Sequence, residues 1–188
     1  LSKLTQNKQQ QIDRRRESGF KTVSIVGYTN AGKSSLFNRL SKKHNLSKNE
    51  LFATLDSTVG KLYLPEIQTE VIVSDTIGFI RNLPPLLISA FKSTLMESVH
   101  ADVLLHIIDV SDPEYESKIQ VVQDILHELG IEDKNIVFVF NKIDRAPALD
   151  EAKITETHKE FSPVFISVKE DAGIPALISS ISKKLENT

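Results

Sequence analysis

The sequence contains no cysteine, so disulfide bonds, zinc–thiolate centres and thiol nucleophiles are excluded, and its composition is compatible with a reducing compartment. No apolar run reaches the roughly 18 residues that a membrane-spanning helix needs. The polar, glutamine-rich start of the chain does not resemble a signal peptide. We therefore expect a cytoplasmic protein with no membrane span.

The chain also lacks a strong net charge, although the charge that it has is unevenly distributed. The formal net charge is −2 over 188 residues. Residues 1–21 hold six basic and two acidic side chains, a balance of +4, which leaves −6 for the remainder. A basic arm on an acidic body suggests contact with polyanions, and a solvated helix or linker is the alternative.

The length and the composition, with 40% hydrophobic and 26% charged residues, are those of a globular protein with an ordinary core. Few apolar residues precede position 19, so we predict a basic helical segment or linker over 1–19 and one domain over 20–188. Because the chain begins with Leu1 and has no initiator methionine, we expect a fragment of a longer protein.

Hydrophobic periodicity predicts strands that alternate with helices after residue 20. The predicted strands are 22–26, 61–64, 70–74, 103–110, 136–140 and 164–167. The predicted helices are 33–40, 114–130 and 174–185, with a further helix opened by Pro84-Pro85. This order predicts an α/β fold with a mostly parallel sheet covered on both faces, in which the 61–74 hairpin makes one edge antiparallel.

The string Gly-Tyr-Thr-Asn-Ala-Gly-Lys-Ser at 27–34 lies between a predicted strand and a predicted helix, as the phosphate-binding pattern GxxxxGK[ST] requires. Gly27 and Gly32 permit a backbone geometry that a Cβ would obstruct, so amide N–H groups can surround a phosphate. Lys33 can supply a positive charge to the β- and γ-phosphates, and the Ser34 hydroxyl can bind Mg²⁺. The alternative is a glycine-containing turn.

Two further strings follow predicted strands, where α/β sheets bind their ligands. In the first, Asp75-Thr76-Ile77-Gly78, the Asp75 carboxylate can reach Mg²⁺ through a water and the Gly78 N–H can contact a γ-phosphate. In the second, Asn141-Lys142-Ile143-Asp144, the Asp144 carboxylate can accept hydrogen bonds from N1–H and the exocyclic amine of guanine. Adenine offers no such pair, so this string predicts a guanine site, with a polar turn as the alternative.

Together these strings resemble translation-factor-type P-loop GTPases, and more narrowly the HflX family of the TrmE–Era–HflX group, over roughly residues 20–170. A less generic string, Leu-Phe-Ala-Thr-Leu-Asp at 51–56, adds to the resemblance, as does Phe-Ile at 79–80 after the DxxG string. The resemblance implies a three-layer P-loop NTPase sandwich and Mg²⁺-dependent GTP hydrolysis to GDP. It also implies binding to the large ribosomal subunit, with a role in ribosome splitting, rescue or biogenesis. Residues 1–18 would end a helical segment after a missing amino-terminal domain, and we expect a monomer.

The resemblance implies that Thr54 is the Mg²⁺-binding threonine of the first switch, although the sequence alone leaves Thr58 as a rival. The family usually has Pro-Thr where this chain has Ser57-Thr58, and Ser-Ala-x where it has Ser167-Val168-Lys169, a triplet that can offer a backbone N–H to guanine O6. Lys33 is the predicted catalytic residue, and Ser34 and Thr54 are the predicted metal ligands. The residues predicted to contact GTP are Gly27, Tyr28, Thr29, Asn30, Ala31, Gly32, Lys33, Ser34, Ser35, Phe52, Ala53, Thr54, Leu55, Asp56, Asp75, Thr76, Ile77, Gly78, Asn141, Lys142, Ile143, Asp144, Ser167, Val168 and Lys169.

Phe79 stands where Ras-like GTPases place a water-orienting glutamine, so we expect slow hydrolysis that a partner completes. A GTP-gated ribosome-binding module with negligible hydrolysis is the alternative, and Asn141–Asp144 argues against a small-molecule kinase. Some relatives in the wider group use an asparagine like Asn30 to hold K⁺, and stabilisation of the loop turn is its alternative role. We expect His106 to be a hydrogen-bonded core residue and Asp109 to be a cap or turn residue.

Overall fold

The computed structural model describes residues 19–41, 58–76, 78, 98–128, 130–131 and 135–187. The basic segment 1–18, the first switch at 51–56 and the helix expected after Pro84-Pro85 lie outside the described residues. Among the described helices, none combines the length and the apolar character needed to cross a bilayer.

The described part of the chain is an α/β structure built on one sheet in the order β2-β3-β1-β4-β5-β6. Only the β2–β3 pair is antiparallel, and every other pair in this sheet is parallel, so the predicted fold class is confirmed. The strands are β1 (Thr22–Gly27), β2 (Thr58–Leu64), β3 (Thr69–Asp75), β4 (Val103–Asp109), β5 (Asn135–Asn141) and β6 (Val164–Phe165). The helices are α2 (Lys33–Ser41), α4 (Tyr115–Glu128), α5 (Glu151–Thr157) and α6 (Ile174–Glu186), with short 3₁₀ turns at Ile143–Arg145 and Lys159–Phe161.

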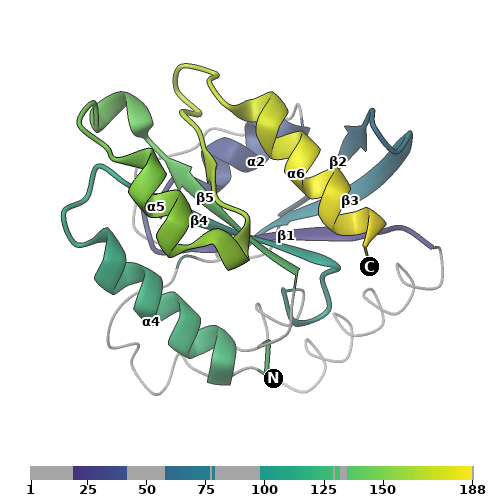
Figure 1. Ribbon diagram of the computed structural model, residues 1–188. Helices are drawn as coiled ribbons and strands as arrows, with labels where there is room; N and C mark the ends of the chain where they lie inside the picture. The colour runs from purple at the N-terminus through teal and green to yellow at the C-terminus, as the bar shows by residue number, and fades with distance from the viewer. Residues whose placement is uncertain are drawn as a thin grey trace.

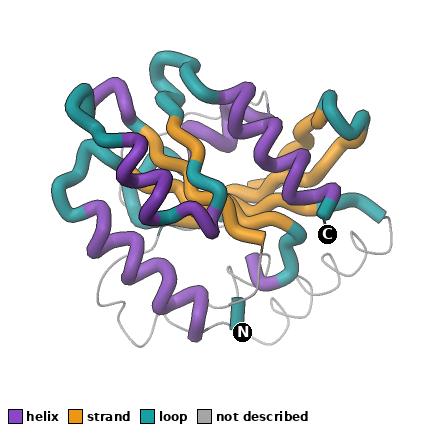
Figure 2. The backbone as a smooth tube through the Cα atoms, viewed as in Figure 1, coloured by secondary structure: helices purple, strands orange, loops and turns teal. Residues whose placement is uncertain are grey.

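Helices cover the sheet on both faces (Figure 1). Leu36 of α2 and Ile181 of α6 pack in one core cluster, while Val122 of α4 and Ile154 of α5 pack in the other. Strand β4 lies between the two clusters and is buried along almost its whole length, as expected for a central parallel strand. Figure 2 shows the strands running between the two helical layers.

The sequence did not reveal α5, because its polar segment carries a single buried hydrophobic residue, Ile154. Its start is fixed by Asp150, whose side chain accepts a hydrogen bond from the Lys153 backbone N–H at 3.0 Å. Strand β6 is shorter than predicted, since Ser167 leaves the sheet and pairs with Ala172 to close a tight loop.

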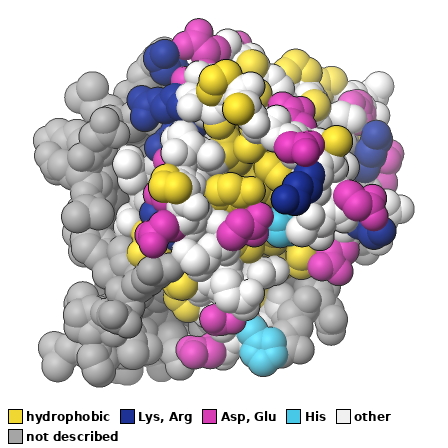
Figure 3. All heavy atoms as spheres, turned by 60° about the vertical axis from the view of Figure 1, so that its left-hand side comes forward, with side chains coloured by type: hydrophobic (Ala, Val, Ile, Leu, Met, Phe, Trp, Pro, Cys, Tyr) yellow, Lys and Arg dark blue, Asp and Glu magenta, His cyan; other side chains and the backbone are white. Residues whose placement is uncertain are grey.

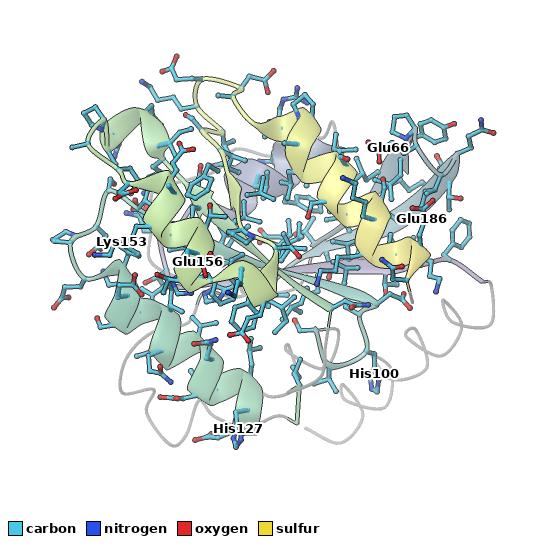
Figure 4. The ribbon with its side chains drawn as sticks, viewed as in Figure 1. Glu66, His100, His127, Lys153, Glu156 and Glu186 are labelled. Carbon is cyan, nitrogen blue, oxygen red and sulfur yellow. The ribbon has the colours of Figure 1, made fainter. Side chains whose placement is uncertain are left out.

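Phe20 and Tyr63 are the large hydrophobic residues exposed on the described surface. Figure 3 shows one face, where hydrophobic side chains gather near the centre with charged ones around them. His100, before β4, and His127, near the end of α4, project from separate elements (Figure 4). No group of His, Asp and Glu suited to hold a metal occurs among the described residues.

Parallel strands bring their carboxyl ends to one edge of the sheet, and polar or glycine residues end them here. β1 ends at Gly27, β3 at Asp75, β4 at Asp109 and β5 at Asn141. Asp109 and Asn141 are direct partners in the β4–β5 register. The fold therefore gathers at one edge the strings that the sequence places more than a hundred residues apart.

The tight loop before α6 depends on Gly173, which has φ +75° and where a Cβ would lie 2.1 Å from the Phe165 carbonyl oxygen. We predict that Gly173→Ala lowers the free energy of unfolding by about 3 kcal/mol or more, because strain and a backbone clash add. Gly130 has φ +71° but open space around its Cβ position, so Gly130→Ala should cost only about 1 kcal/mol. Urea unfolding of both variants checks this, and equal losses would contradict the clash.

Candidate nucleotide-binding site

The predicted phosphate loop needs its two glycines for contacts that the structure shows. Gly27 lies against β4, and a Cβ there would be 2.3 Å from the Ile107 carbonyl oxygen. Gly32 has φ +102°, and a Cβ there would be 2.3 Å from Asn141 Nδ2. Its carbonyl oxygen accepts the hydrogen bond of the Leu36 N–H at 2.9 Å as α2 begins. The loop therefore runs from the end of β1 into a helix amino terminus, where backbone N–H groups favour an anion.

Lys33 is nearly buried beneath this loop, with 6% of its surface exposed. Its Nζ donates a hydrogen bond to the Tyr28 carbonyl oxygen at 2.9 Å. Burial lowers the pKa of Lys33 to about 8, and the negative charge of Asp75 partly opposes this by raising it. An ammonium group has three donors, so Lys33 can bind phosphate oxygens besides Tyr28, and such anions would compensate its desolvation.

Of the groups predicted to bind Mg²⁺ directly or through a water, Ser34 and Asp75 lie side by side, while Thr54 lies outside the described residues. Ser34 Oγ donates a hydrogen bond to Asp75 Oδ2 at 2.6 Å. A hydroxyl and a carboxylate are hard oxygen donors, which suit Mg²⁺. Gly78 approaches the same place, since a Cβ there would be 2.9 Å from Lys33 Nζ and 2.8 Å from Thr29 Cγ2. Thr76 instead directs its hydroxyl inward, to the Ile25 carbonyl oxygen at 2.7 Å.

Asn141 joins the predicted base site to the phosphate loop. Its Nδ2 donates to the Ala31 carbonyl oxygen at 2.8 Å, and its Oδ1 accepts from the Val168 N–H at 3.2 Å. The side chain is buried, so both hydrogen bonds are shielded from water. Asn141 therefore holds three segments together: the phosphate loop, its own Asn-Lys-x-Asp string and the loop after β6.

The next residue, Lys142, makes a second connection to the phosphate loop. Its backbone is left-handed, with φ +67°, which is uncommon for a non-glycine residue and often marks a functional site. Its Nζ donates to the Asn30 carbonyl oxygen at 2.8 Å and to Asp109 Oδ2 at 2.6 Å. The lysine stem therefore spans the distance between the predicted base-binding string and the loop.

Asp144 is exposed, and its carboxylate is oriented by a neighbour. Ser167 Oγ donates to Asp144 Oδ1 at 2.6 Å, and the Glu170 N–H donates to the same Ser167 oxygen at 3.1 Å. The hydrogen bond from Ser167 holds the pKa of Asp144 below its usual value, so the carboxylate is ionised at neutral pH. An ionised carboxylate has only acceptors, which is what the N1–H and amine edge of guanine requires.

The structure brings together most of the predicted residues: 27–35, 75–76, 78, 141–144 and 167–169 share this edge of the sheet. Phe52, Ala53, Thr54, Leu55, Asp56 and Ile77 lie outside the described residues, as does Phe79. Thr58, the rival of Thr54, is the first residue of β2 and lies opposite Asp75 in the register. Asn30 is exposed with φ +64°, a left-handed conformation that asparagine tolerates in turns.

One of two expectations about residues of β4 needs correction. His106 is a core residue, but its Nδ1 has no hydrogen-bond partner among the described residues, and burial lowers its pKa to about 3. The ring packs edge-on against Phe138 at a centroid distance of 4.9 Å, so it is held by aromatic contact. Asp109 is a turn residue as predicted, since it accepts a hydrogen bond from the Ser111 N–H at 3.0 Å.

The ion pair of Asp109 with Lys142 was missed. A signal was available in the sequence, because a polar residue ends each of the two predicted strands that became β4 and β5. The hydrophobic pattern does not show, however, that these two strands are neighbours in the sheet. The pair of Arg39 on α2 with Asp171 was also missed. It joins α2 to the loop after β6, and it links residues 132 positions apart that carry no pattern.

A family model described as "50S ribosome-binding GTPase" matches residues 22–142. The chain belongs to this GTPase family. "GTPase HflX" of Caldanaerobacter subterraneus is 42% identical, over 98% of this chain and 41% of that protein. "GTPase HflX" of Escherichia coli is 36% identical, over 96% and 44%. The predicted resemblance to the HflX family is confirmed, and the chain spans less than half the length of these relatives.

Solved structures of GTP-binding proteins share the fold. A GTP-binding protein of Sulfolobus solfataricus in complex with GDP has a TM-score of 0.72 and 28% identity, over 89% of this chain and 53% of that one. Era in complex with MgGDPNP and a segment of 16S ribosomal RNA has a TM-score of 0.71 and 26% identity, over 88% and 56%.

We predict that Asn141→Ala weakens both the fold and nucleotide binding, because it leaves the Ala31 carbonyl and the Val168 N–H without their buried partner. The expected loss in the free energy of unfolding is about 2 to 4 kcal/mol, and GDP affinity should fall at least about tenfold. Asn187→Ala removes an exposed amide that bonds only to the Lys183 carbonyl at 2.8 Å, so it should change neither quantity. Urea unfolding and GDP titration test this, and unchanged GDP affinity in Asn141→Ala would refute the role of the link.

Proposed function

We propose that this chain is a Mg²⁺-dependent domain that binds GTP, hydrolyses it to GDP and acts on the large ribosomal subunit. The observation that carries the proposal is the direct connection of the two most informative strings. Asn141 and Lys142 bond to the Ala31 and Asn30 carbonyl oxygens of the phosphate loop, at 2.8 Å in each case. A single guanine nucleotide could therefore bind with its phosphates at the loop and its base at the Asn-Lys-x-Asp string.

In the proposed complex, the loop N–H groups and Lys33 hold the β- and γ-phosphates, and Lys33 stabilises charge that develops on them. Mg²⁺ would be held by Ser34 and, from the first switch, by Thr54, with Asp75 acting through a water. The oxygen donors at Ser34 and Asp75 fit this ion, and the Era structure contains MgGDPNP. Bound Mg²⁺ supplies positive charge that neutralises the triphosphate.

The ribosomal part of the proposal rests on the family. The matched model is described as ribosome-binding, and the relatives are HflX proteins more than twice as long as this chain. By that resemblance, the whole protein would act in ribosome splitting, rescue or biogenesis. The switch function suits Phe79, since a site without the usual glutamine depends on a partner to complete it. The alternative, a module that docks on the ribosome without hydrolysing GTP, would bind the nucleotide in the same way and would differ only in its rate of GTP turnover.

We predict that Asp144→Asn weakens GTP binding and shifts preference towards xanthosine nucleotides. The amide presents a donor where guanine needs an acceptor pair, so guanine affinity should fall about a hundredfold or more. Competition between GTP and XTP for the parent and the variant measures this. Equal GTP affinity in both proteins would refute the guanine assignment, and a matched loss for both nucleotides would indicate misfolding.

We predict that purified large subunits accelerate GTP turnover of the protein by about tenfold or more over its intrinsic rate. Single-turnover assays with and without subunits measure the difference, and small subunits are the control. Turnover that stays negligible with large subunits would favour the docking module.

Repeating the assay in K⁺ and Na⁺ at equal ionic strength, with the parent and Asn30→Ala, separates a K⁺ site at Asn30 from a purely structural role in the turn.

A further inference from the structure

Asp109 lies at the carboxyl end of β4 and contacts a residue of the proposed base site. Its Oδ2 accepts a hydrogen bond from Lys142 Nζ at 2.6 Å. Its Oδ1 accepts from the Ser111 N–H at 3.0 Å and from Ser111 Oγ at 2.6 Å. Both carboxylate oxygens are therefore engaged, so the carboxylate is fixed by its own turn and presents one oxygen to the lysine.

The ion pair is well shielded, with 18% of the Lys142 side chain and 19% of the Asp109 side chain exposed. An ion pair in such a place is stronger than an exposed one, because water and salt screen it less. The backbone reinforces it, since the Val110 N–H donates to the Asn141 carbonyl oxygen at 3.1 Å. The end of β4 is thus rigidly attached to the start of the Asn-Lys-x-Asp string.

The outer side of the phosphate loop borders a cavity of about 170 Å³. Tyr28, Asn30 and Ala31 line it from the loop, and Asp109 and Ile119 line it from β4 and α4. Tyr28 and Ala31 pack against the core clusters, whereas Asn30 is exposed. The chain of bonds from Asp109 through Lys142 Nζ to the Asn30 carbonyl oxygen holds this exposed part of the loop directly.

We propose that Asp109 is a positioning residue for guanine nucleotide binding. It anchors Lys142 Nζ, so that the lysine stem stays across the place of the purine face and the Asn30 carbonyl stays in its position in the loop. The inference rests on the proposed base site, because Lys142 touches nucleotide only if Asn141–Asp144 reads the base. Asp109 acts through the lysine and does not touch the ligand.

This role makes a different prediction from a role in reading the base. The lysine stem packs on any purine, whereas Asp144 distinguishes the purine edge. Asp109→Asn should therefore weaken GDP and inosine diphosphate binding by the same factor, about fivefold to tenfold. The KM for GTP should rise by that factor with kcat nearly unchanged, since the anchor serves the ground state and the transition state alike.

Asp102 provides a matched control at the opposite end of β4. It accepts from the Thr22 N–H at 2.7 Å and from Thr22 Oγ1 at 2.9 Å, and its Oδ1 lies 3.9 Å from Lys21 Nζ. It thus has the same three kinds of partner as Asp109, yet it lies away from the site. Asp102→Asn should affect thermal stability as Asp109→Asn does but leave GDP affinity at the parent value.

The deciding experiment is a double-mutant cycle with Lys142→Met, which keeps an apolar stem and removes Nζ. GDP affinity is measured for the parent, Asp109→Asn, Lys142→Met and the double variant, by displacement of a fluorescent guanine nucleotide. The expected result is a loss from Asp109→Asn in the parent and no further loss in the Lys142→Met background. Parent-like affinity of Asp109→Asn, or an equal loss in both backgrounds, would overturn the inference. Failure of the parent to bind GDP would instead overturn the proposed function.

Discussion

The buried side chain of Asn141 is the contact on which the rest of the site depends. Its two hydrogen bonds fix the phosphate loop on one side and the loop after β6 on the other, at 2.8 and 3.2 Å. Gly32 must lack a Cβ because Asn141 occupies the space where one would lie. The first string is therefore shaped by the second, although 110 residues separate Asn141 from Ala31 in the chain.

Two lysines also support the phosphate loop at this edge of the sheet. Lys33 and Lys142 both direct their ammonium groups to carbonyl oxygens of the loop, at Tyr28 and Asn30. Lysine ammonium groups therefore satisfy the Tyr28 and Asn30 carbonyl groups of the loop, and the Asn141 amide satisfies that of Ala31. Burial lowers the pKa of Lys33 to about 8, which shows that its ammonium group is poorly solvated, so a bound anion stabilises it more than it would stabilise an exposed lysine. A bound polyanion would relieve the unfavourable desolvation of Lys33.

Much of this arrangement could be predicted because the informative residues are local. Gly27, Gly32 and Lys33 fall in one short string, and the hairpin of β2 and β3 follows from two apolar runs around a turn. Helix α5 could not be predicted, since Ile154 alone marks its buried face. The Asp109–Lys142 pair could not be predicted either, because it depends on β4 and β5 being neighbours in the sheet. His106 shows the reverse case, in which a polar residue in an apolar strand is held by an aromatic ring with no hydrogen bond to Nδ1.

The unequal lengths of the sheet ladders have a consequence for motion. In the described sheet, β5 and β6 share two register pairs, whereas β4 and β5 share seven. Opening a part of a protein costs free energy in proportion to the contacts that it breaks, so the shortest ladder opens most often. Ser167, which orients Asp144, follows directly from that ladder. The proposed base site therefore combines two parts of the sheet that differ in local stability: Asn141 ends the long β4–β5 ladder, whereas Ser167 follows the short β5–β6 ladder, where local opening costs the least free energy.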